Sequence, residues 1–134
     1  RLNDMGIEPF LISSSLIAVM AQRLVRVLCP ACREAYQPDA AQKALLAIAA
    51  DEPVTFYRAK GCSECNQQGY KGRTGIYEYI EVDETIRRLI HDRASEQQLV
   101  EYARQSWPSI RDDGRRRVLA GDTTLEEVLR VTSV

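Results

Sequence analysis

The sequence predicts a mainly helical α+β fold, and three observations lead to this prediction. Apolar residues recur every three to four positions near both ends of the chain, which indicates amphipathic helices. Short runs rich in β-branched and aromatic residues occur in the middle, which indicates strands. Two pairs of cysteines enclose the first of these runs. We therefore expect a long helix, a small tetracysteine insert with a short antiparallel β element, and a C-terminal bundle of short helices.

The N-terminal segment is expected to form one long helix from Pro9 to the region of Cys29. Proline suits a first helical turn, where its missing N–H would have no partner anyway. Cys29 precedes Pro30, and a residue before proline avoids the α conformation. The uncharged stretch 9–22 is too short to cross a bilayer, so we expect a buried helix. The apolar stripe consists of Ile12, Leu16, Met20, Leu24 and Val27 with Leu28.

The middle of the chain is expected to hold a helix and two strands. Asp39 can cap a helix over 39–50, which Pro53 would end. The run 54–59 reads as a strand because it is rich in β-branched and aromatic residues. The alternation over 76–82 predicts a second strand of about seven residues. The glycine-rich segment 69–75 is expected to form a tight turn before that strand.

Helices are expected throughout the remainder of the chain. Asp83 can cap a first one, and Ser95 with Gln98 forms a capping box for a second. A third runs from Ile110 and stops at Gly121. Thr124 with Glu127 is a further capping box that opens the last helix.

All four cysteines occur in two C-x-x-C pairs, which is metal-binding spacing. Two intervening residues allow both thiolates of a pair to face one ion at about 2.3 Å. A site with four cysteine ligands has no open position, so its metal is expected to be structural, and zinc is the first candidate. The predicted ligands are Cys29, Cys32, Cys62 and Cys65.

Three other uses of the cysteines remain open at this point. Two disulfides would suit a secreted domain, a thioredoxin-like redox pair would use a single C-x-x-C, and an iron centre would use the same four ligands. If zinc binds, it can contribute about 10–16 kcal/mol, comparable with the stability of a whole domain. We therefore expect the fold of the insert to depend on metal. Arg26, Arg33 and Lys60 are candidates to offset the excess thiolate charge.

Other signals favour structural roles. The glycines of 69–75 have the density of a phosphate loop, but the chain contains no G-x-x-x-x-G-K-[ST]. His91 is the only histidine and has no partner suggested by sequence. The triplet Arg115–Arg117 lies beside Asp112 and Asp113, so we expect a solvated helix face rather than a basic patch. A net charge of −1 argues against strong nucleic-acid binding.

With these motifs in hand, the chain resembles the C-terminal third of the type II secretion and type IV pilus assembly ATPases, of the GspE/PulE/PilB type. The matching stretches follow one another over nearly the whole chain. They are Arg1–Phe10, Ser13–Leu16, Ala21–Arg26, both cysteine pairs, Gly69–Glu78, Ser109–Gly114 and Leu125–Thr132. Because the chain opens at Arg1 in what reads as the middle of a domain, we expect a fragment.

The resemblance implies a hexameric, RecA-like ATPase on the cytoplasmic face of the bacterial inner membrane. Its partners would be the other subunits and the inner-membrane secretion platform, without nucleic acid and without a membrane span of its own. The implied division is the end of the ATPase domain over 1–28, a tetracysteine zinc subdomain over 29–82 and a helical subdomain over 83–134. The four cysteines match the family's zinc ligands.

ATP and Mg²⁺ would bind only in the full-length family protein. Because this chain has no P-loop, we expect no ATP hydrolysis from it alone. Gln22 and Arg23 are candidates for contacts with a neighbouring subunit or with nucleotide. The alternative to this whole interpretation is a stand-alone zinc ribbon that binds nucleic acid.

Overall fold

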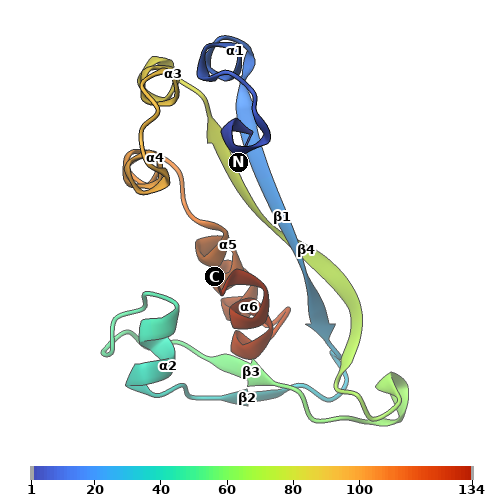
Figure 1. Ribbon diagram of the computed structural model, residues 1–134. Helices are drawn as coiled ribbons and strands as arrows, with labels where there is room; N and C mark the ends of the chain where they lie inside the picture. The colour runs from blue at the N-terminus through green and yellow to red at the C-terminus, as the bar shows by residue number, and fades with distance from the viewer. Residues whose placement is uncertain (1, 134) are drawn as a thin grey trace. The chain divides into compact units, whose positions relative to one another are not determined.

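The computed structural model describes residues 2–133, which form two compact units. One unit joins the residues up to Ala21 with Glu78–Ser109, and the other joins Gln22–Tyr77 with the residues from Ile110 onward. Two paired strands, β1 (Ala18–Leu28) and β4 (Tyr70–Glu81), contribute residues to both units (Figure 1). The α+β class is thereby confirmed. The three-segment division over 1–28, 29–82 and 83–134 remains a prediction.

The predicted long N-terminal helix is wrong in its second half. Helix α1 covers only Pro9–Ser15, and the chain then continues as β1. Residues four apart share a face in a helix, but they also share a face in a strand, because four is a multiple of two. The apolar stripe therefore fitted both structures. Within the strand, Val25 and Leu28 are buried while Met20 and Leu24 are exposed.

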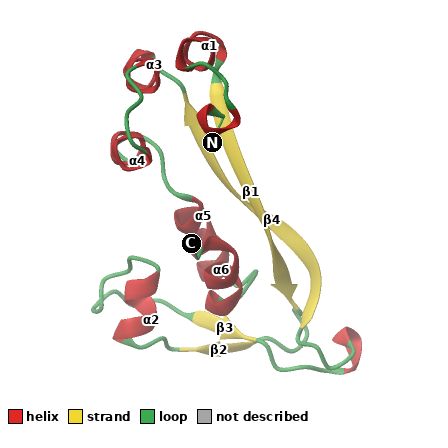
Figure 2. Cartoon of the chain, in the orientation of Figure 1, coloured by secondary structure: helices red, strands yellow, loops and turns green. Residues whose placement is uncertain are grey.

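The first unit is built from short helices around the end of the β1–β4 ladder. Besides α1 it holds a 3-10 turn, η1 (Asn3–Met5), and helices α3 (Glu84–His91) and α4 (Glu96–Ala103) (Figure 2). Helix α3 packs against both α1 and α4. Both predicted caps are confirmed, because the Asp83 side chain accepts from the N–H of Ile86 and Ser95 forms its capping box with Gln98.

An antiparallel pair of short strands organises the segment between the two cysteine pairs. Strand β2 (Glu34–Tyr36) pairs with β3 (Phe56–Arg58), with Glu34 opposite Arg58 and Tyr36 opposite Phe56. Helix α2 (Ala40–Leu45) lies between them in sequence and is capped by Asp39, as predicted, but it is shorter than the expected 39–50. Strand β4 is longer than expected, since it includes most of the glycine-rich segment predicted to be a turn.

The core of the second unit is formed by this insert and the last two helices. Helix α5 (Ile110–Leu119) packs against α6 (Leu125–Thr132) and contacts β3. The contact between α5 and α6 is close, because a Cβ on Gly114 would lie 2.5 Å from Val128 Cγ1. Burial of this cluster supplies the hydrophobic stabilisation that the insert could not gain alone. Its buried members are Leu46, Ile48, Phe56, Val118, Leu125 and Val128.

Candidate metal centre

The four cysteines that the sequence singled out meet at one point. All four Sγ atoms lie within 4.8 Å of one another. The distances Cys29–Cys62, Cys32–Cys65 and Cys62–Cys65 between sulfur atoms are each 3.8 Å. A regular tetrahedron of sulfurs at about 2.3 Å from a zinc ion has edges of about 3.8 Å. A disulfide would require about 2.05 Å, and the cysteines are free. The donor set and its spacing therefore fit one tetrahedral metal ion.

The strand pairing explains how cysteines 33 positions apart in the sequence come together. The first pair follows the end of β1, and the second lies on a 3-10 turn, η2 (Ser63–Cys65), shortly before β4. Extending the β2–β3 register by two residues places Cys32 opposite Lys60, next to the second pair. On the other side, the Cys29 N–H donates to the Gly69 carbonyl at 3.0 Å. Backbone hydrogen bonds alone thus bring both ends of the insert together.

Backbone N–H groups point at two of the sulfurs. Gly61 donates to Cys32 Sγ at 3.4 Å, while Cys62 and Gly69 donate to Cys65 Sγ at 3.3 and 3.1 Å. Both glycines are required by the geometry. Gly61 has φ +108°, and a Cβ there would lie 2.7 Å from the Gln67 carbonyl oxygen. Gly69 has φ +81°, and a Cβ there would lie 2.6 Å from Ala59 Cβ. Such N–H donors stabilise negative charge on sulfur.

The cysteine thiols differ in acidity because their surroundings differ. Burial raises the pKa of Cys65, but hydrogen bonds from the backbone N–H groups of Cys62 and Gly69 outweigh it and lower the pKa to about 6. Burial raises the pKa of Cys32 to about 11, although the hydrogen bond from the Gly61 N–H acts to lower it. Cys29 and Cys65 are buried, whereas Cys32 and Cys62 are partly exposed. The centre therefore has a buried side and an open side.

The three cations expected to offset the thiolate charge have other partners. Arg33 donates to the Gly121 carbonyl at 2.6 Å and lies over the Tyr57 ring. Lys60 is 3.9 Å from the Glu34 carboxylate. Arg26 binds Glu127. The structure thus shows the backbone N–H groups, rather than these side chains, donating to the sulfurs.

A buried carboxylate that sequence reasoning missed binds the end of β1, three residues before the first cysteine pair. Glu127 accepts from the Arg26 N–H at 2.7 Å, from the Arg26 guanidinium at 2.9 and 3.1 Å and from the Arg130 guanidinium at 2.9 and 3.2 Å. Burial raises its pKa, but these hydrogen bonds from Arg130 and Arg26 outweigh the burial and lower it to about 2. The sequence suggested only a capping box with Thr124. The Thr124 hydroxyl does accept from the Glu127 N–H, while the Glu127 side chain binds the arginines.

The remaining candidates of the sequence analysis lie apart from the cysteines in the chain. Gln22 and Arg23 are exposed on β1, and the Gln22 amide donates to the Tyr77 hydroxyl at 3.5 Å. Their contact role remains a prediction. His91 is exposed at the end of α3, with its ring edge-on to Phe10.

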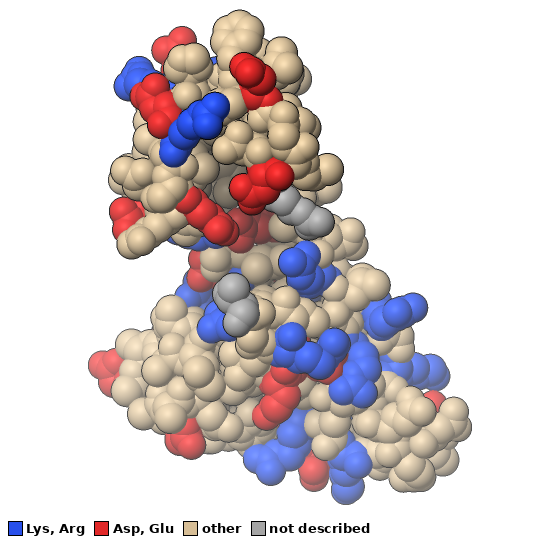
Figure 3. All heavy atoms as spheres, in the orientation of Figure 1, with Lys and Arg blue, Asp and Glu red and all other residues tan. Residues whose placement is uncertain are grey.

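The arginine triplet of α5 is paired with acidic residues of its own unit. Arg115 lies 3.8 Å from the Asp112 carboxylate, Arg116 lies 2.9 Å from Asp113, and Arg117 lies 3.1 Å from Asp122. Acidic side chains also lie among the basic ones on the face drawn in Figure 3. The expected solvated helix face holds only for Arg116, which is exposed, because Arg115 and Arg117 are half-buried.

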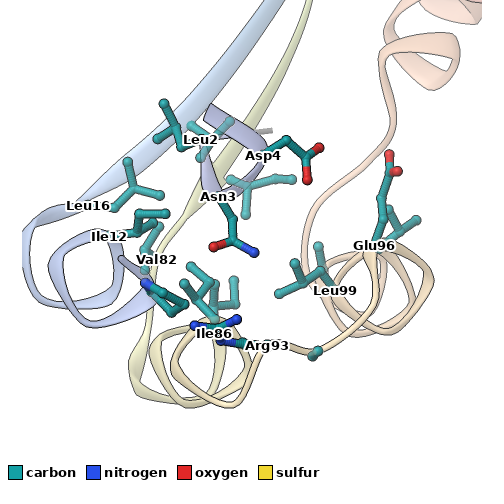
Figure 4. A pocket seen from close by; sticks show the side chains of 17 residues that line it. Leu2, Asn3, Asp4, Ile12, Leu16, Val82, Ile86, Arg93, Glu96 and Leu99 are labelled. Atoms are coloured by element: carbon teal, nitrogen blue, oxygen red, sulfur yellow. The ribbon is translucent and has the colours of Figure 1, made fainter. Parts of the chain in front are cut away.

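The first unit contains a hollow of about 520 Å³ that is lined mainly by aliphatic side chains. Ile12, Leu16, Val82, Ile86 and Leu99 contribute to its wall (Figure 4). A wall of this composition is suited to packing rather than to acid–base or metal chemistry. Within residues 2–133, none of the helices combines the length and the apolar character that crossing a membrane requires.

Comparison with known proteins places the chain in a family. Residues 1–130 match the family described as "Type II/IV secretion system protein". The chain is 63% identical over 132 residues to the type II secretion system protein E of Pseudomonas aeruginosa. This match covers 98% of this chain and 26% of that protein. The chain is 56% identical to the type II secretion system ATPase E of Vibrio cholerae, with the same coverage. The chain thus spans about a quarter of the length of these relatives. It belongs to the type II/IV secretion system protein family, as the resemblance predicted.

Proposed function

We propose that this chain is a zinc-stabilised structural part of a type II secretion ATPase. One observation carries the proposal: four free cysteine sulfurs from two distant segments converge with the spacing of a tetrahedral sulfur site. Zinc would be held by Cys29, Cys32, Cys62 and Cys65, and because the protein fills every position around it, the ion would hold structure rather than activate water.

This part of the protein would act as a scaffold that presents contact surfaces to neighbouring proteins. The relative from Vibrio cholerae is named an ATPase, and this chain contains no P-loop. ATP and Mg²⁺ would therefore bind elsewhere in a full-length protein, and this chain alone would not hydrolyse ATP. Its partners would be other subunits of a hexamer and the secretion platform at the cytoplasmic face of the inner membrane. Gln22 and Arg23, exposed on β1, are the candidates for a contact with a neighbouring subunit or with nucleotide.

Metal analysis tests the proposal. The reduced 134-residue chain, dialysed against metal-free buffer, should retain about one zinc ion per chain by inductively coupled plasma mass spectrometry. Cys65→Ser should lose it, because this change removes the buried thiol that accepts two backbone N–H groups. Ser63→Ala, two residues away between the same cysteines, is the matched control and should retain the ion. Retention of zinc by Cys65→Ser, or absence of zinc from the parent chain, would contradict the proposal. One iron per chain would indicate a rubredoxin-like centre instead.

A further inference from the structure

The segment that joins α5 to α6 contacts the chain on both sides of the first cysteine pair. Thr123 Oγ1 donates to the Arg26 carbonyl at 2.7 Å, and the Leu28 N–H donates to the Asp122 carbonyl at 2.8 Å. Beyond the cysteines, Arg33 donates to the Gly121 carbonyl at 2.6 Å. The segment immediately before Cys29 and the residue immediately after Cys32 are thus both tied to one turn.

The second cysteine pair reaches the same turn through its own neighbour. Gly69, whose N–H donates to Cys65 Sγ, is followed by Tyr70. The Tyr70 hydroxyl is 2.9 Å from Thr124 Oγ1, the cap of α6, and the Arg26 guanidinium lies 4.1 Å from the centre of the Tyr70 ring. The start of α6 therefore touches the chain beside both halves of the sulfur cluster.

Burial makes these contacts costly to break. Thr123, Thr124 and Glu127 are each at most 2% exposed. Glu127 is the only charged side chain among the buried residues of the described part of the chain, and both of its oxygens are bound. A buried carboxylate is stable only while its hydrogen-bond donors stay in place. The donor at 2.7 Å is the backbone N–H of Arg26, three residues before Cys29.

From these contacts we infer that Glu127 is a positioning residue for the metal centre. It holds in place the end of β1 that leads to Cys29. Retention of the metal and the contacts of α6 with this strand end therefore depend on each other. Reciprocity follows from linkage, since a contact that strengthens metal binding must itself be strengthened by the metal. This inference rests on the proposed function for the presence of a metal, but it concerns residues that are not ligands.

The test measures zinc release from the loaded 134-residue chain to an excess of a chromogenic chelator. Glu127→Gln keeps the shape of the side chain but removes its charge. We expect release about tenfold faster than in the parent chain, the lower end of the range for residues that support metal ligands. Glu126→Gln, the exposed neighbour on the same helix, should release zinc at the parent rate.

Val128→Ala separates positioning from general stability. This substitution removes buried core volume next to Glu127 without touching Arg26, so it should lower stability while leaving zinc release within about twofold of the parent rate. Equal acceleration in Val128→Ala and Glu127→Gln would overturn the inference, because stability alone would then set retention. An unchanged rate in Glu127→Gln would overturn it as well.

If Glu127→Gln does not fold, hydrogen exchange on the parent chain tests the same linkage. Hydrogen exchange should show that chelation of zinc removes protection from the amides of Arg26 and Leu28, which donate to Glu127 and Asp122. Protection that survives chelation contradicts the linkage. If the parent chain binds zinc and only these effects are missing, the linkage fails and the proposed function stands. If the parent chain binds no metal, both fail.

Discussion

Replacing Glu127 by glutamine should destabilise the second unit by about 2 kcal/mol at pH 7. The pKa of the carboxyl is lowered from 4.5 to about 2 in the folded chain. Each pKa unit corresponds to about 1.4 kcal/mol, so this difference corresponds to about 3 kcal/mol in favour of the folded state. The Arg26 and Arg130 side chains are 53% and 56% exposed, and solvent screening reduces the expected effect to about 2 kcal/mol.

The effect should depend on pH with a definite sign. Because the folded state lowers the pKa of Glu127, its stabilisation is complete above the unfolded value of about 4.5 and is lost as the pH falls towards 2. The difference in stability between the parent chain and Glu127→Gln should therefore be largest at neutral pH and shrink in acid.

Urea unfolding monitored by circular dichroism measures this difference. All variants are compared at one zinc concentration and at a series of pH values. Glu126→Gln is the control, since Glu126 is exposed, and it should unfold within about 0.5 kcal/mol of the parent chain. If Glu127→Gln unfolds together with this control at pH 7, or if the difference grows as the pH falls, the ionised carboxylate does not stabilise the fold.

Two further predictions concern packing. Gly69→Ala should destabilise the zinc-loaded chain by about 1–3 kcal/mol, because the new Cβ would lie 2.6 Å from Ala59 Cβ. Gly72 has a similar φ of +82° but no atom within 4 Å of an added Cβ, so Gly72→Ala should cost only about 1 kcal/mol. Equal costs in thermal unfolding would contradict the steric argument. Phe56→Ala should destabilise the second unit by about 3–5 kcal/mol in urea unfolding, since Phe56 is fully buried and packs edge-on against Tyr36; a cost below about 1 kcal/mol would show that the core is elsewhere.

The helix caps could be predicted from sequence because capping is local. Asp39, Asp83, Ser95 and Thr124 each accept from an N–H three residues further on, as their positions suggested. The strand β1 could not be recognised in the same way. Its apolar spacing of four residues fits both periods, and only the pairing with β4, about fifty residues later, selects the strand.

The candidate site shows the same division between local and distant information. The cysteines could be identified because the C-x-x-C spacing is a direct consequence of metal geometry. Glu127 could not, because its main partner, Arg26, lies 101 positions away in the sequence. Its local context, three residues after Thr124, indicates only a cap. No pattern in the chain signals that its carboxylate turns to the strand end instead.

X-ray absorption at the zinc edge measures the number and type of atoms that bind the metal. For the purified, reduced chain, we expect a first shell of four sulfur atoms at about 2.3 Å, without nitrogen or oxygen ligands. A first shell with fewer than four sulfurs, or with light atoms from water or other side chains, would contradict the closed four-cysteine centre on which the proposed function depends.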